Sequence, residues 1–278
     1  MFDGVKRIFW LWGQCFKSMG RVSTFVPFVL YALVQLGVLI SLINFINPPF
    51  ANIYIPIIKK FFNAAALHYP TFYVFVAPLF NQINLVLSGI IGIVLIAMAT
   101  KLFAQKFRDE AGAFGEATGT SFKKYGSLFV VWLIETVLTL VIIIGLPTLL
   151  KKIFDPDYRM MQIFEFAGLL LGILVASLFA YTTALIVLDN QSIGESLSKT
   201  LKIFSRYSFT SYVIVAVPTL AYFPLSFILR KVDFLITKFS PEMITTLLGF
   251  GILLTFFTSY LQIGSITRFY LLVTERKR

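Results

Sequence analysis

Six long apolar segments constrain this chain more than any other feature of its sequence. They lie at about 24–45, 82–104, 127–150, 165–188, 208–230 and 244–272. An α-helix needs about 20 apolar residues to cross the hydrocarbon core of a bilayer. Only 13% of the residues are charged, which is about half the share usual in soluble domains. We therefore expect an all-α integral membrane protein whose six transmembrane helices form three hairpins.

The distribution of positive charge predicts the orientation of these spans. Sixteen of the 24 Lys and Arg residues lie in polar segments on the side of the two termini, and eight lie on the other side. Loops on the cytoplasmic side carry an excess of Lys and Arg, so both termini are expected in the cytoplasm. The net charge of +11 is then explained by topology and by anionic headgroups of the inner leaflet, and nucleic acid is not an expected partner.

Short related strings suggest that one unit is repeated three times within a single membrane domain, 1–278. FKSMGR (16–21), FKKYGS (122–127) and LKIFSR (201–206) precede the first, third and fifth spans. TKLF (100–103), TALI (183–186) and TRFY (267–270) close the second, fourth and sixth. Agreement in order and spacing is the signature of an internal repeat. The predicted units are about 1–106, 107–189 and 190–278.

Each repeat is expected to begin with an amphipathic helix lying in the membrane interface. Phe9, Trp12 and Phe16 recur at helical spacing in the first unit, and such a stripe opposite basic residues is typical of interfacial helices. Ser192 and Glu195 have the spacing of a capping box in the third. Two interpretations remain open: the helices only connect hairpins, or their basic faces bind lipid headgroups or a partner. The contact residues under the second interpretation are Lys17, Arg21, Lys123, Lys124, Lys202 and Arg206.

The segment 46–81 is the longest expected loop and lies on the side opposite the termini. Prolines interrupt it, and TFYVFVAPLF (71–80) is too short to cross the membrane by itself. We expect this string to form an outer-surface helix or a re-entrant piece packed against the bundle.

Three stretches of the sequence resemble a known group of proteins. They are GLPTLL (145–150), ALIVLDNQSIGESLSKTLKIFSRY (184–207) and ITRFYLLVTERKR (266–278). The chain resembles the UPF0259-type family of six-span bacterial inner-membrane proteins and the related membrane domain fused to some glycerophosphodiester phosphodiesterases. The resemblance implies a bacterial inner-membrane location and a stand-alone membrane domain. It carries no catalytic group to this chain.

Groups that could carry out catalysis are scarce. His68 is the single histidine and Cys15 the single cysteine, so neither a catalytic triad nor a transition-metal site has the partners that it needs. The phosphate-binding string G-x-x-x-x-G-K-[ST] is absent from the sequence. We therefore expect a protein that is not an enzyme and that holds no metal or cofactor.

Small residues predict where helices approach each other closely. Gly168, Gly172 and Ala176 recur every four residues and share one face of the fourth span, as at helix–helix contacts in membranes. In the fifth span, Pro218 and Pro224 are expected to kink the helix.

One carboxylate, Glu135, lies within the apolar string VVWLIETVLTL (130–140). Inserting a charged side chain at the centre of a helix costs roughly 2.5–3.5 kcal/mol, so such a residue is neutralised, paired or functional. Counting along the spans places Gln262 at a similar depth and Gln35 slightly deeper. The three residues are expected to form either an interhelical hydrogen-bond cluster or a proton- or cation-linked site.

The sequence favours a non-enzymatic membrane protein, either an accessory subunit of a larger complex or a factor in membrane and lipid homeostasis. The alternative is a small transporter or channel in which Glu135 belongs to a polar intramembrane site.

Overall fold

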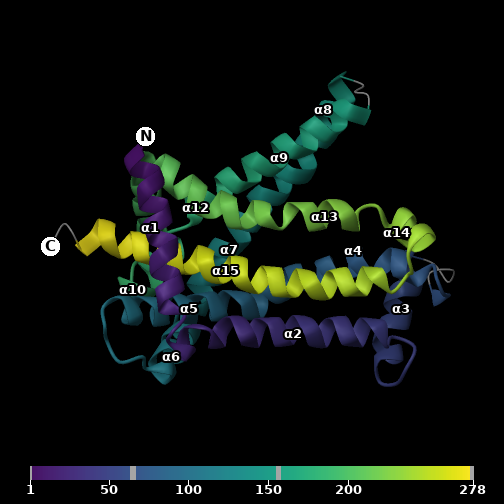
Figure 1. Cartoon of the computed structure of the whole chain (residues 1–278), viewed down its shortest axis with the longest axis horizontal. Helices are drawn as coiled ribbons and strands as arrows, with labels where there is room; N and C mark the ends of the chain where they lie inside the picture. Colours follow the sequence, from purple (N-terminus) through teal and green to yellow (C-terminus); the bar gives the residue numbers. More distant parts are fainter. Residues whose placement is uncertain (1, 63–66, 155–157, 276–278) are drawn as a thin grey trace. The chain divides into compact units, whose positions relative to one another are not determined.

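The computed structural model describes residues 2–62, 67–154 and 158–275, and all secondary structure within them is helical (Figure 1). Six helices are long and apolar enough to cross a membrane: Val26–Ile43, Phe72–Phe107, Tyr125–Phe154, Arg159–Leu188, Ser208–Leu229 and Met243–Glu275. The chain is thus an all-α, multi-pass membrane protein, as the sequence predicts.

A separate amphipathic helix precedes each of the first, third and fifth spans. These helices are α1 (Phe2–Ser18), α6 (Phe114–Lys123) and α11 (Ile193–Arg206). The start of α11 has the expected capping box, because the Ser192 side chain accepts from the Glu195 backbone and the Glu195 side chain accepts from the Ser192 backbone. The arrangement of three hairpins, each with a preceding helix, is confirmed.

Helices α4 (Phe72–Leu87) and α5 (Ile93–Phe107) correct the expected start of the second span. They join through the π-helical segment Ser88–Gly92 into one span that includes the string 71–80 almost entirely. Pro78 lies inside α4 and removes one backbone hydrogen bond. Phe72, Val76 and Phe80 are nonetheless buried at helical spacing against a core that contains Phe45 and Ile244, and this packing holds the segment in the helix. The expectation of a separate surface or re-entrant piece is wrong.

Besides the second span, with its π-helical segment, three further spans change helical geometry or break within their length. The third contains α7 (Tyr125–Leu140), a second π-helical segment (Val141–Gly145) and α8 (Leu146–Phe154). The fourth consists of α9 (Tyr158–Phe179) and α10 (Thr182–Leu188). The fifth is α12 (Ser208–Ala221) followed by α13 (Phe223–Leu229), so the break occurs between the two prolines as predicted. Breaks of this kind mark places where the helical hydrogen-bond ladder is interrupted.

The chain divides into two compact units. Unit 1 comprises residues 1–27, 93–219 and 259–278, and unit 2 comprises 28–92 and 220–258. The boundaries of these units cut across the three sequence repeats, since a unit of packing and a unit of repetition need not coincide. The threefold repeat therefore stays a prediction.

Unit 2 is built from two segments that are far apart in the chain, 28–92 and 220–258. Its helices are α2 (Val26–Ile43), α3 (Phe50–Phe62), α4, α13, α14 (Val232–Lys238) and the first part of α15 (Met243–Glu275). The rings of Phe45 and Phe72 stack with centroids 3.8 Å apart, and the Tyr54 and Ser41 hydroxyls, 2.7 Å apart, hydrogen-bond to tie α3 to α2.

Unit 1 contains all three interfacial helices. One of its cores gathers Leu11 of α1, Leu185 of α10, Ile214 of α12 and Phe269 of α15. In the hairpin formed by the third and fourth spans, α7 and α8 lie beside α9 (Figure 1). The ends of α5, α10 and α15 carry the polar residues that form the candidate site.

Candidate functional site

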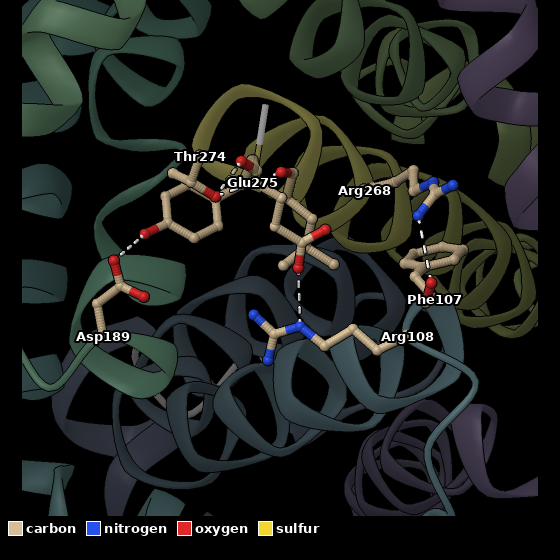
Figure 2. Close-up of polar contacts among 8 residues, drawn as sticks. Phe107, Arg108, Asp189, Arg268, Thr274 and Glu275 are labelled. Atoms are coloured by element: carbon tan, nitrogen blue, oxygen red, sulfur yellow. Dashed lines mark hydrogen bonds and ion pairs between the residues drawn. The ribbon is translucent and has the colours of Figure 1, made fainter. Parts of the chain in front are cut away.

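A polar cluster lies where α5, α10 and α15 end in unit 1 (Figure 2). The Tyr270 hydroxyl donates a 2.6 Å hydrogen bond to Asp189 Oδ2. Arg108 Nε donates to Glu275 Oε1 at 2.9 Å. We call Arg108, Asp189, Arg268, Tyr270 and Glu275 the polar cluster. Its two charge-assisted hydrogen bonds connect the last span to the ends of the second and fourth.

Arg268 links the cluster to the interfacial helix α1. One terminal nitrogen donates to the Phe107 carbonyl oxygen at 3.3 Å. The guanidinium carbon lies 5.1 Å from the Phe107 ring centroid and 5.4 Å from that of Trp10. Both distances are within the range of cation–π attraction, so Arg268 holds α1 beside the ends of α5 and α15.

The two helix ends beside the cluster share one backbone conformation. Asp109 has φ 55° and Asn190 has φ 54°, in the left-handed region that Asp and Asn tolerate better than most residues. The Glu110 amide donates to the Gln105 carbonyl at 2.9 Å, which is the long bond of a Schellman helix end. The left-handed residues therefore end the two helices directly after Arg108 and Asp189, two members of the polar cluster.

An open pocket of about 500 Å³ adjoins the cluster, and we call it the polar pocket. Its lining residues are Arg108, Leu188, Asp189, Asn190, Gln191 and Lys199. Five of the six are polar, and the charges of Arg108, Lys199 and Asp189 sum to +1. The Gln191 Oε1 atom is buried and has no hydrogen-bond partner among the described residues. The pocket therefore presents the cationic donors of Arg108 and Lys199 together with the exposed Asp189 carboxylate as an acceptor.

Helix α6 is attached to the same unit by a second set of polar contacts. Lys101 of α5 and Glu116 of α6 form a 3.1 Å ion pair, and Gln105 donates to the same carboxylate at 3.2 Å. Lys101 follows Thr100 in TKLF as Arg268 follows Thr267 in TRFY. Corresponding basic residues at two span ends thus hold two different interfacial helices.

The six predicted headgroup contacts all lie on or next to the interfacial helices. Lys17, Lys123, Lys202 and Arg206 are exposed, whereas Arg21 and Lys124 are half-buried. Exposed aromatic side chains accompany them, including Phe16 at 54% and Phe122 at 64% exposure. Aromatic and basic side chains side by side are typical of helices at the membrane interface.

The predicted intramembrane cluster is not joined by hydrogen bonds among the described residues. Glu135 is half-buried on α7 and has no hydrogen bond or ion pair there. Gln262 is half-buried on α15, in the same unit. Gln35 is buried on α2 and belongs to unit 2. The structural or functional role of these three residues stays a prediction.

Gly168 and Gly172 lie against the third span at its π-helical segment. A Cβ atom on Gly168 would lie 3.5 Å from the Ile142 carbonyl oxygen, and one on Gly172 would lie 2.9 Å from Ile143 Cδ1 and 3.5 Å from Thr139 Cγ2. The two helices are antiparallel, so the next turn of each brings Ala176 toward the level of Glu135. Gly168 and Gly172 therefore mark a close helix–helix contact between α9 and the third span.

A buried hydroxyl network, which the sequence patterns do not predict, fastens α1 to α15. The Tyr260 hydroxyl lies 2.8 Å from Ser18 Oγ and 3.1 Å from Thr24 Oγ1, and Cys15 Sγ lies 3.4 Å from Ser265 Oγ. Burial raises the pKa of the Cys15 thiol to about 11, although the Ser265 hydroxyl and the charge of Arg268 lower it. Cys15 is thus a neutral thiol at physiological pH and is poorly nucleophilic.

The polar pocket is not evident from the sequence, because the sequence patterns assign its residues to membrane orientation and to the family resemblance. Arg108 and Lys199 contribute only to the charge count, and the DNQ string (189–191) only to the family resemblance. A usable signal exists, since polar triplets, RDE at 108–110 and DNQ at 189–191, directly follow two spans. Within the described residues, no group of three or more His, Cys, Asp or Glu side chains could hold a metal ion.

Fold and site together define a helical multi-pass membrane protein with a polar pocket at the ends of its spans. Comparison with protein-family models, curated proteins and solved structures finds no match. The resemblance to UPF0259-type proteins stays a hypothesis, and a functional proposal has to rest on the geometry.

Proposed function

We propose that this chain is a non-enzymatic protein of the bacterial inner membrane, with both termini in the cytoplasm. It acts either as a membrane and lipid homeostasis factor or as an accessory subunit of a larger membrane complex. The interfacial helices α1, α6 and α11 bind the anionic inner leaflet and hold the spans in register with it.

The observation that carries this proposal is the shared surface of the three interfacial helices. Each combines exposed basic residues with exposed apolar side chains: Lys17 with Phe16, Lys123 with Phe122, and Lys202 with Leu201. An exposed Lys or Arg near an anionic surface contributes roughly 1 kcal/mol of attraction. The neighbouring apolar side chains gain by entering the boundary between headgroups and acyl chains.

Neutralising four of these charges tests the proposal. The variant combines Lys123→Gln, Lys124→Gln, Lys202→Gln and Arg206→Gln. We expect it to retain fewer anionic lipids when extracted into nanodiscs and analysed by native mass spectrometry, because the lost attraction is on the order of 1 kcal/mol per charge.

The matched control removes four charges from the side opposite the termini: Lys59→Gln, Lys151→Gln, Lys152→Gln and Lys238→Gln. All four side chains are exposed, and the net charge changes equally. Equal lipid retention by the wild type and both variants would contradict the proposal. A stoichiometric co-purifying protein would identify the chain as an accessory subunit, whereas a lone protein enriched in lipid would favour the homeostasis role.

A transporter or channel is the second candidate function, and the position of Glu135 supports it. The carboxylate is half-buried in a span and has no hydrogen-bond or ion-pair partner among the described residues. Under this alternative, Glu135→Gln abolishes transport while the protein still folds. An unchanged rate of solute uptake by Glu135→Gln in proteoliposomes would exclude the residue from a transport site.

A further inference from the structure

The polar pocket offers two groups that can bind an anion. Arg108 uses Nε for its bond to Glu275, and the two terminal nitrogens of its guanidinium point away from that carboxylate (Figure 2). Lys199 is exposed on α11, one turn after the capping residue Glu195, and lines the same pocket. A guanidinium and an ammonium on one pocket are the groups that proteins use for phosphate oxygens.

The same pocket also offers acceptors. Asp189 accepts from Tyr270 through Oδ2, and its second oxygen has no partner among the described residues. The Gln191 Oε1 atom is buried without a partner in the part of the chain that the structure describes. Because Gln191 Oε1 is buried, the acceptor that a ligand can reach from the open pocket is the exposed Asp189 carboxylate, and a cationic donor matches its charge.

These features argue against a simple inorganic anion. The Asp189 carboxylate repels a multiply charged anion, and the pocket volume of about 500 Å³ lies in the range of small-molecule sites. A ligand that matches the charged lining residues carries one anionic charge for Arg108 and Lys199 and a cationic donor for Asp189.

We infer that the polar pocket binds a phosphoethanolamine group, with the phosphate on Arg108 and Lys199 and the ammonium on Asp189. The group is supplied either by a zwitterionic phospholipid headgroup or by a soluble phosphodiester of ethanolamine. The lipid source rests on the proposed function, because α11 must lie in the interface for Lys199 to reach headgroup level. The pocket then selects lipids by headgroup type, whereas the outer faces of the interfacial helices bind lipids by their negative charge.

Titration of the full-length protein in detergent tests the pocket with soluble probes. The probes are sn-glycero-3-phosphoethanolamine and sn-glycero-3-phosphoglycerol, which share the phosphodiester and differ in the ammonium. We expect the wild type to prefer the ethanolamine probe by roughly tenfold, the effect of one charge-assisted contact. A second arm counts phosphatidylethanolamine and phosphatidylglycerol retained in nanodiscs that contain both in equal amounts.

Asp189→Asn is the main variant, because asparagine keeps the shape and still accepts from Tyr270. We expect it to lose the preference for the ethanolamine probe, and Asp109→Asn to keep it. Asp109→Asn is the control because it removes the same charge from a residue outside the pocket. Asp109 is exposed, and it has the same left-handed backbone conformation after α5 as Asn190 has after α10. Likewise, Lys199→Gln is expected to lower the affinity for both probes several-fold. Lys202→Gln, on the same helix, is expected to leave both affinities unchanged.

The outcomes separate the two proposals and the two sources. A preference in the nanodisc arm that Asp189→Asn removes identifies a lipid headgroup, and one confined to the soluble probes identifies a soluble phosphodiester; both support the pocket. The absence of any preference in both arms, or a preference that Asp189→Asn leaves intact, overturns it. If the four-charge variant loses anionic lipid and keeps its preference for the ethanolamine probe, both proposals are supported. If only one of these two results is obtained, only the corresponding proposal is supported.

Discussion

Tyr270 donates a 2.6 Å hydrogen bond to the carboxylate of Asp189, although the two residues are separated by 81 positions in the chain. Tyr270 is fully buried near the end of the last span, and Asp189 is the first residue after the fourth. The bond fixes one wall of the polar pocket. The stability of the pocket and the closure of the bundle at this end are therefore coupled.

Tyr270→Phe is expected to destabilise the protein by about 1–1.5 kcal/mol, because it removes a hydrogen bond to a charged group whose exposed carboxylate can then bind water. Thermal unfolding in detergent measures the change. Tyr69→Phe is the control, since Tyr69 is 69% exposed and its ring contact with Tyr73 survives the substitution. Equal unfolding temperatures for the two variants would show that the bond contributes nothing.

Gly264→Ala is expected to destabilise the protein by about 1–3 kcal/mol through overpacking. The added Cβ would lie 2.9 Å from Cys15 Sγ and 3.0 Å from Phe103 Cζ, and both side chains are fully buried. Gly249→Ala on the same helix is the control, because its Cβ would meet nothing within 4 Å. Denaturant unfolding monitored by circular dichroism distinguishes them, and a Gly264→Ala protein as stable as the control would contradict the packing described for α1.

The capping box of α11 makes the first turn of that helix sensitive to acid. Backbone and hydroxyl hydrogen bonds from Ser192 hold the pKa of Glu195 below its usual value. A lowered carboxyl pKa in the folded state contributes stability at pH above the unfolded value, and the contribution is lost as pH falls through the folded value. We expect the protection factors of amides in the first turn of α11, taken relative to intrinsic exchange at each pH, to fall below the usual glutamate range.

Ser192→Ala is expected to produce at neutral pH the loosening of the first turn of α11 that acid produces in the wild type. It removes the side-chain cap, which costs about 0.5–2 kcal/mol, and raises the pKa of Glu195 toward its usual value. Protection factors in the first turn should be lower at neutral pH than in the wild type and should change less on acidification. Identical pH profiles for the two proteins would show that the box does not govern this helix start.

Arg268→Lys is expected to loosen α1 while preserving charge. Lysine cannot stack a planar group between Trp10 and Phe107, and each such contact is worth about 0.5–2 kcal/mol. Hydrogen exchange of α1 peptides should therefore accelerate by roughly tenfold. Arg206→Lys serves as the control because that side chain is exposed and lies over its neighbour Tyr207. Unchanged exchange in α1 would mean that the hydroxyl network around Tyr260 holds the helix alone.

Sequence patterns predicted the features that depend on neighbours along the chain. Apolar runs identified the six spans, Ser192 and Glu195 marked the start of α11, and the two prolines bracketed the break after Ala221. Each follows from local hydrogen bonding or from the length needed to cross a bilayer. Tertiary packing does not enter these arguments.

Features that depend on distant residues were not predictable in the same way. The string 71–80 is proline-interrupted and short, and only the stacking of Phe72 on Phe45 and burial beside Ile244 explain why it continues the second span. The polar pocket requires the ends of α5 and α10 to meet α11. Helix rotation and approach fix that meeting, and an apolar run specifies neither.

Unit 2 also has a consequence for the order in which the protein can assemble. Its first part, 28–92, leaves the ribosome well before its second part, 220–258, and the intervening 93–219 belongs to unit 1. At typical synthesis rates this interval is on the order of ten seconds. During that time Phe72, Val76 and Phe80 lack their partners from the last span, so lipid, the insertion machinery or a chaperone has to cover them. Truncation before residue 220 would therefore leave a unit that cannot complete its core, while most of unit 1 has already been made.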